Sequence, residues 1–219
     1  PLSGHQANQA VTSIDLNFYE HLNVRGTVKI QWHGQENGDV RQYLYLLDSN
    51  KQKEEFVDAV LKGIYSYAFR DSYEFKSEED VDSPLVLQIA FHMDNWLLDA
   101  GGGNSFLHMY GGDIKVPEFV AKNRIFPIRL SSLEKQTVHI TVKIPDSFDV
   151  EVPESFALAN EYISNHVQYT YKDHLLQLDQ ELNNLKVDVP LDQIDSLRAS
   201  WEKISQANRK GVLLKARKK

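Results

Sequence analysis

The feature that most limits the possible folds of this chain is the alternation of apolar and polar residues near its start. Between residues 11 and 20 one set of alternate positions is largely apolar, namely Thr12, Ile14, Leu16 and Phe18. Residues 24–32 alternate in the same way, with Val24, Gly26, Val28, Ile30 and Trp32 on one face. Because successive side chains of a strand point to opposite faces, both segments are predicted to be strands that bury one face. The short link between them predicts a hairpin.

The spacing of the apolar residues changes after Gly38. Val40, Tyr43, Leu44 and Leu47 are spaced for a helix, with Asp39 as its expected N-cap. A second helix is predicted over residues 51–67, followed by an acidic connection over residues 77–84. Strands are expected to resume at 85–91 and 105–110, and a helical turn at 117–120.

The second part of the chain is rich in short strand patterns marked by proline. We predict strands at about 126–130, 134–145, 148–152, 155–162, 165–172, 174–180 and 182–188. Pro145 and Pro153 are expected at strand ends or edges, because proline has no N–H to donate to a central strand pairing. A helix is predicted over residues 191–208 with Gly211 as its C-cap, and a short apolar strand over 212–214.

These patterns predict a mainly β or α+β fold with two β-sandwich-like domains. The first, residues 11–125, is a β-rich domain with a helix pair inserted. The second, residues 126–219, is a small β-sandwich with one C-terminal packing helix and a final strand. Residues 1–10 contain no initiator methionine and are expected to be a disordered start, either a cut end or a cloning remnant.

Composition excludes several classes of function. Hydrophobic residues make up 42% and charged residues 25% of the chain, as in an ordinary folded protein. The net charge of −7 argues against nucleic acid as a partner, since binding phosphates requires a basic surface. The chain contains no cysteine, and therefore no thiolate zinc ligand and no cysteine nucleophile. No apolar run approaches the roughly 20 residues that span a bilayer. We expect neither a cofactor nor a bound metal.

The C-terminal motifs resemble those of a known family. They are Arg124-Ile-Phe-Pro-Ile, the strand ending Lys143-Ile-Pro, the segment Val152-Pro-Glu-Ser, and the last helix and strand from Trp201 to Leu214. This pattern is similar to the non-catalytic, β-rich region of bacterial transglutaminase-like proteins, which flanks a papain-like core. The resemblance covers most of residues 11–215 and is loose before residue 120.

The resemblance implies an accessory role. It implies that the partner is an upstream domain of the same protein, and a periplasmic or extracellular setting. The family's Cys–His–Asp arrangement cannot be carried over without a cysteine, so we expect no catalytic residue and no enzymatic activity in this chain. The expected function is to position the catalytic domain or to mediate surface interactions with a protein or glycan.

A first alternative is a module that binds carbohydrate or a cell-wall polymer. Trp32 and Trp201 are assigned to the core, which leaves Trp96 as the candidate exposed aromatic residue. Its expected neighbours in such a ligand site are Asn95 and Asn104, on either side of the glycine-rich loop Gly101-Gly-Gly. That loop is predicted to turn a hairpin rather than to bind phosphate, because a strand pattern follows it.

The remaining polar clusters favour less specific interpretations. His92, Asp94 and His108 lie on neighbouring predicted segments, but their loose spacing gives little support for a metal site. Glu78, Glu79, Asp80 and Asp82 lack the spacing of a calcium loop and are predicted to form a solvated acidic loop. A second alternative is a hydrolase that uses carboxylates, which requires two acidic side chains in a concave site and a raised pKa in one of them.

Overall fold

The protein is mainly β, with helices packed on its sheets. The computed structural model describes residues 8–19, 22–109, 116–120, 124–130 and 132–217. The sheets form a sandwich-like arrangement, as the sequence predicted. The expected disordered start falls outside the described residues at positions 1–7. It is wrong at positions 9 and 10, because the first strand already begins at Gln9.

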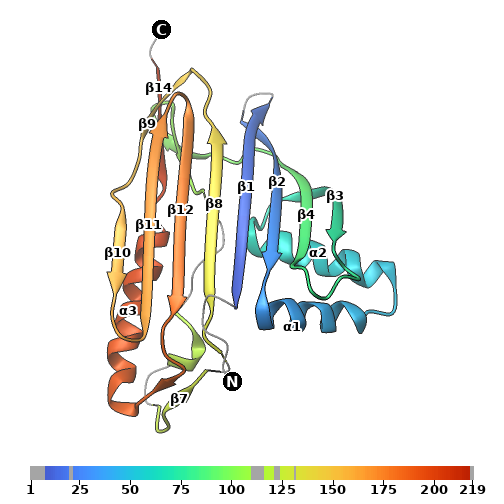
Figure 1. Ribbon diagram of the computed structural model, residues 1–219. Helices are drawn as coiled ribbons and strands as arrows, with labels where there is room; N and C mark the ends of the chain where they lie inside the picture. Colours follow the sequence, from blue (N-terminus) through green and yellow to red (C-terminus); the bar gives the residue numbers. More distant parts are fainter. Residues whose placement is uncertain (1–7, 20–21, 110–115, 121–123, 131, 218–219) are drawn as a thin grey trace.

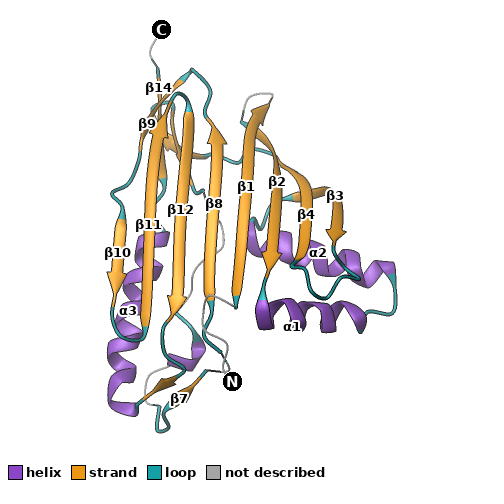
Figure 2. Ribbon diagram, in the orientation of Figure 1, coloured by secondary structure: helices purple, strands orange, loops and turns teal. Residues whose placement is uncertain are grey.

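One large sheet of eight strands forms the front of the molecule in Figures 1 and 2. Its strands pair antiparallel, except that β1 and β8 are parallel. In spatial order the strands are β10 (Phe156–Ala159), β11 (Ile163–Lys172), β12 (Leu175–Asn184), β8 (Lys135–Lys143), β1 (Gln9–Tyr19), β2 (Asn23–Trp32), β4 (Leu85–Met93) and β3 (Phe69–Lys76).

The alternating pattern of the first two strands is confirmed. β1 and β2 form a hairpin in which Tyr19 lies opposite Asn23. Ile14 and Leu16 are buried, and β4 repeats the alternation from Leu85 to Met93. The large sheet therefore has one face in the core and one polar face toward solvent, as an antiparallel sheet commonly does.

Two helices follow the first hairpin, as predicted. These are α1 (Gly34–Tyr45) and α2 (Asn50–Ile64). The expected N-cap Asp39 is wrong, because α1 begins earlier and His33 occupies the N-cap position. Ser49 caps α2, its hydroxyl oxygen accepting a hydrogen bond from the Gln52 N–H at 3.3 Å. Figure 1 shows α2 behind β2 and β4, and α1 below the ends of these strands.

The sequence pattern does not predict the edge strand β3. Only its residues Tyr73 and Phe75 pack against the core, and most of its other residues are exposed and polar. A strand at the edge of a sheet carries a weak apolar alternation, because only one strand pairs with it and solvent reaches its outer side. A bulge between Arg70 and Ser72 weakens the pattern further.

A second, four-stranded sheet lies on the core side of the large sheet. Its order is β5 (Leu98–Gly101), β6 (Asn104–Leu107), β14 (Val212–Ala216) and β9 (Phe148–Glu151). The predicted glycine hairpin is confirmed: Gly101 lies opposite Asn104, and all three glycines have positive φ. Leu107, Val212 and Leu214 join the same core cluster as the large sheet.

The C-terminal helix covers the other end of the large sheet. α3 (Ile194–Asn208) follows the short 3-10 turn η2 (Leu191–Gln193) and packs Trp201 and Ile204 into a second core cluster with Ile163. η1 (Glu118–Val120) confirms the turn expected near residue 117. The C-cap is Arg209, so the assignment of Gly211 as C-cap is wrong. Gly211 instead lies against the Leu107 carbonyl, where an added Cβ would be 3.3 Å from that oxygen.

The strand predicted over residues 182–188 is also wrong in its bounds. β12 continues to Asn184, and a separate two-residue strand, β13 (Asp188–Val189), pairs with β7 (Ile128–Arg129). The division of the chain at residue 126 stays a prediction. Strand pairing crosses that position twice, from β1 to β8 and from β6 to β14.

Candidate ligand-binding site

A cavity lies where α2, β3, β4 and β5 meet. Its volume is about 850 Å³, within the range typical of sites for small ligands. Its aromatic lining consists of Tyr65, Tyr67, Phe69 and Trp96. Asn95 also lines it. The structure thus brings two of the three candidate ligand-binding residues, Asn95 and Trp96, to one hollow surface.

The floor of the cavity is built from rings anchored in the core. The Tyr65 ring stacks on Phe91 with centroids 5.6 Å apart and meets the Trp96 ring edge-on at 6.1 Å. The Tyr65 hydroxyl donates a hydrogen bond to the Met109 carbonyl at 2.5 Å. Trp96 is half-buried and also packs against Phe18, at a centroid distance of 5.9 Å. These contacts fix the positions of both rings before any ligand arrives.

The rim of the cavity is apolar and exposed. Tyr67, Phe69 and Leu98 expose 82%, 58% and 55% of their surface, respectively. The Phe69 ring stacks on His92 with centroids 5.5 Å apart. Large apolar side chains gathered around a cavity mouth mark an interaction surface, because isolated soluble proteins seldom leave such groups uncovered together.

The loop after β4 is held in place by backbone hydrogen bonds. Asn95 has a positive φ of 49°, and its N–H donates to the Asn23 side-chain oxygen at 3.1 Å. The Trp96 N–H donates to the Leu22 carbonyl at 3.3 Å. Asparagine tolerates this left-handed conformation better than most residues. The loop therefore directs the Asn95 side chain and the Trp96 ring to the cavity from a fixed backbone.

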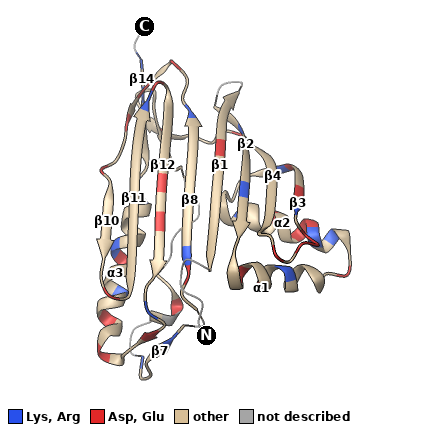
Figure 3. Cartoon of the chain, in the orientation of Figure 1, with Lys and Arg blue, Asp and Glu red and all other residues tan. Residues whose placement is uncertain are grey.

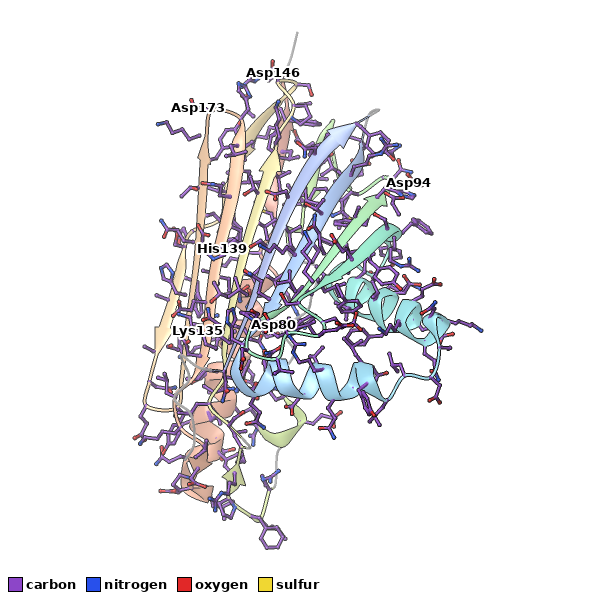
Figure 4. All side chains as sticks on the ribbon, turned by 45° about the vertical axis from the view of Figure 1, so that its right-hand side comes forward. Asp80, Asp94, Lys135, His139, Asp146 and Asp173 are labelled. Atoms are coloured by element: carbon purple, nitrogen blue, oxygen red, sulfur yellow. The ribbon has the colours of Figure 1, made fainter. Side chains whose placement is uncertain are left out.

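Five polar side chains surround the rings, namely Lys62, Ser66, Asp94, Asn95 and His108. Within the described part of the chain, none of these side chains takes part in a hydrogen bond or an ion pair. Figure 4 shows Asp94 beyond the end of β4, far from Asp146 and Asp173. The cavity thus offers both donors and acceptors to a ligand, beside aromatic rings.

The other candidates from the sequence are dispersed. Asn104 lies in the β5–β6 hairpin and does not line the cavity. His92 Nδ1 lies 2.7 Å from an Asp71 carboxylate oxygen, whereas Asp94 and His108 line the cavity without it. Among the described residues, no three side chains of the metal-binding types are close enough to hold an ion. Trp32 and Trp201 are buried, as predicted.

The acidic segment, residues 77–84, is a loop whose conformation is fixed by hydrogen bonds. Arg41 of α1 donates hydrogen bonds to the carbonyls of Ser77, Glu78 and Asp80 at 2.6, 2.5 and 2.8 Å. The Asp80 carboxylate accepts hydrogen bonds from the Ser83 hydroxyl and from the backbone N–H of Asp82. These bonds to its own loop lower the pKa of Asp80. The loop is exposed, as predicted, but its conformation is fixed from α1.

The Glu36 carboxylate has the raised pKa that a hydrolase requires, but it does not line the large cavity. Burial and, to a lesser extent, the nearby charges of Glu134 and Asp39 together raise the pKa of Glu36 to about 7. Glu36 lines neither the large cavity nor the two smaller ones of about 430 and 260 Å³. Among the described residues that line the large cavity, Asp94 is the one with a carboxylate side chain. The geometry therefore does not favour the carboxylate hydrolase.

The solvent face of the large sheet carries mixed charges that are largely paired. His139 Nδ1 lies 2.6 Å from an Asp179 oxygen, and Lys135 Nζ lies 2.6 Å from a Glu181 oxygen. Figure 3 shows acidic and basic residues interspersed over β12, β8, β1 and β2. A face of this kind offers a phosphate backbone no continuous basic track.

Comparisons with known proteins identify no relative. No protein-family model matches the chain, and neither a curated protein nor a solved structure matches it. The transglutaminase-like resemblance therefore stays a prediction. None of the helices in the described segments is long and apolar enough to cross a membrane.

The sequence analysis missed the exposed rings of the cavity. The sequence predicts a helix that ends at Tyr67 and assigns no element to Phe69, whereas α2 ends at Ile64. The available signal was the run Tyr65-Ser-Tyr-Ala-Phe69, where aromatic residues alternate with small ones just before a strand. That alternation predicts a strand face, but it does not say that the face borders a cavity.

Proposed function

We propose that the protein is a non-catalytic module that binds carbohydrate or a cell-wall polymer, and that the cavity beside Trp96 is its site. The observation that carries this proposal is the composition of the cavity. Exposed rings of Tyr67 and Phe69 stand beside polar side chains such as Asn95 and Asp94 that have no partner within the described residues.

A sugar ring is complementary to this combination. Its C–H face is apolar and packs against aromatic rings, while its hydroxyl groups both donate and accept hydrogen bonds. Unpaired side chains at the edge of a cavity gain hydrogen bonds to such hydroxyls without breaking bonds within the protein. A purely apolar ligand would instead desolvate Lys62 and Asp94 with no compensating partner.

The same proposal includes an accessory role in a larger protein. The resemblance of the C-terminal motifs to those of transglutaminase-like proteins supports a position beside a catalytic domain, which a binding module would direct to its substrate. The partner is then an upstream domain of the same protein, in the periplasm or outside the cell. Sequencing the gene upstream of residue 1 tests this part: a papain-like Cys–His–Asp segment supports it, and its absence removes most of the support.

Replacing Tyr67 tests the binding site. Tyr67 is exposed and supports no core contact, whereas Trp96 packs against Phe18 and Tyr65 and its loss would disturb the fold. The unmodified protein is expected to sediment with at least one of chitin, cellulose, xylan and peptidoglycan. We expect Tyr67→Ala to weaken that binding roughly three- to ten-fold, the range for losing one stacked ring.

Tyr45→Ala is the matched control, since Tyr45 is 89% exposed on α1 and does not line the cavity. It is expected to bind as the unmodified protein does. The proposal is wrong if the unmodified protein binds none of the four polymers. It is also wrong if Tyr67→Ala and Tyr45→Ala bind equally well.

A further inference from the structure

The outer face of the small sheet carries a row of apolar side chains. Leu98 of β5 lies directly opposite Phe106 of β6, and Phe106 lies opposite Leu213 of β14. Residues directly opposite each other on paired strands project from the same face of a sheet. Leu98 and Phe106 expose 55% and 42% of their surface, and Leu213 is half-buried. These three side chains, the apolar row, face away from the core.

The apolar row begins at the cavity. Leu98 belongs to the row and also lines the cavity beside Phe69 and Trp96. Since neighbouring strands lie about 4.8 Å apart, the row reaches about 10 Å from β5 to β14. The row is therefore longer than a single sugar ring bound in the cavity.

Charged pairs bound the far end of the row. Glu151 of β9 lies opposite Leu213 and forms an ion pair with Lys215. Asp149 and Arg217 form a second pair beside it at 2.7 Å. Because each of these charges is neutralised by its partner, this end of the row does not favour a charged ligand.

We propose that the site continues along the apolar row and binds a glycan chain of several rings, with one ring in the cavity and the following rings over Phe106 and Leu213. This inference rests on the proposed carbohydrate-binding function and names its ligand as an extended polymer rather than a monosaccharide. Each of three neighbouring strands contributes one side chain to the row, so successive contacts along it lie about 4.8 Å apart. A stable protein interface needs about 800 Å² from each partner, which a strip of three side chains does not provide.

The test measures affinity against chain length. Soluble oligosaccharides of chitin and of cellulose, from one to six rings, are titrated into the protein and followed by calorimetry. For the oligosaccharide that binds, affinity is expected to rise with each ring up to about three, the number that the cavity, Phe106 and Leu213 accommodate. Phe106→Ala is expected to lose roughly three- to ten-fold in affinity for the longest chain and little for the shortest. Phe106→Trp, which keeps a ring, is expected to retain the affinity for long chains.

Phe126→Ala is the matched control, because Phe126 is 67% exposed and lies two residues before β7. Figure 1 shows β7 at the opposite end of the molecule from β14. Circular dichroism and a thermal melt establish that each variant is folded. If short and long chains bind equally, or if Phe106→Ala matches Phe126→Ala, the extended site is wrong while the cavity proposal stands. If no chain of either kind binds, the extended site is wrong, and the proposed function is overturned as well if the unmodified protein sediments with none of the four polymers.

Discussion

At the scale of single residues, the environment of Glu36 differs strongly from that of an ordinary surface residue. It lies in the first turn of α1, where a helix normally favours a carboxylate. Burial nevertheless raises its pKa to about 7, with Glu134 and Asp39 adding repulsion. One of its carboxylate oxygens is buried and has no hydrogen-bond partner among the described residues. Burial and like charge therefore outweigh the helix dipole at this position.

The raised pKa of Glu36 predicts a pH-dependent stability. Its ordinary pKa is 4.5, so between about pH 4.5 and 7 the unfolded chain releases a proton that the folded protein retains. The free energy of unfolding is therefore expected to fall as pH rises through this window. We expect Glu36→Gln to be more stable than the unmodified protein at pH 8 by on the order of 1 kcal/mol, discounted because the carboxyl group is partly exposed.

Urea unfolding at pH 4, 6 and 8 measures this effect. Glu79→Gln, in the exposed acidic loop, serves as the control and is expected to follow the unmodified protein at every pH. A Glu36→Gln variant that shows the same pH profile as the unmodified protein would show that Glu36 is not held in its neutral form near pH 6.

At the scale of elements, α1 fixes a loop that has little structure of its own. Arg41 donates to four carbonyl groups of the β3–β4 connection, and its Nε donates to the Asn37 side-chain oxygen at 2.9 Å. The same Asn37 oxygen accepts a hydrogen bond from the N–H of Leu85, at the start of β4. The acidic segment is thus ordered by a residue distant in sequence.

Removing the Arg41 guanidinium is expected to release this loop. Arg41→Ala leaves the loop carbonyls without their donors, and we expect a loss of roughly 1–2 kcal/mol in the free energy of unfolding. Hydrogen exchange is expected to become faster in residues 77–84 and to stay unchanged in β1 and β2. Lys51→Ala, which removes an exposed helix pair with Glu55, is the control. Unchanged exchange in residues 77–84 would contradict the role of Arg41.

At the scale of the whole molecule, strand pairing ties the two halves of the chain together. β8 hydrogen-bonds to β1 over nine residue pairs, and β14 pairs with both β6 and β9. The main core cluster likewise draws on Ile14 from the first half and Ile140 from the second. The halves therefore share strands as well as a hydrophobic core.

This pairing predicts that the described halves unfold together. Residues 126–219 alone would expose the edge of β8 that β1 covers and the edge of β14 that β6 covers, so we expect this fragment not to fold. The full chain is expected to unfold in one transition, with the signals of Trp32 and Trp201 changing together. A fragment with a dispersed proton spectrum, or two separate transitions, would show that residue 126 is a true domain boundary.

Part of the fold and of the site was predictable from the sequence. The strands at Ile14 and Val28 and the helix carrying Trp201 have clear periodicity, because each buries one face against a core. Edge strand β3 and the start of α1 were not found correctly, because solvent covers much of their surface and their pattern is weak. The sequence indicates Trp96 and Asn95 as candidate site residues, but not Tyr67 and Phe69. Whether a side chain is exposed depends on which residues pack around it in the folded protein, and the local sequence does not specify those residues.

By itself, the sequence determined the fold class, most strands, the core positions of Trp32 and Trp201, and the glycine hairpin. Each of these depends on local periodicity or on a backbone conformation that glycine adopts easily. Only the tertiary structure decided that β1 lies beside β8, that β5 and β6 join β14, and that a cavity opens beside Trp96. Those features depend on contacts between residues far apart in the chain, and local sequence patterns carry no record of which distant segments will pair.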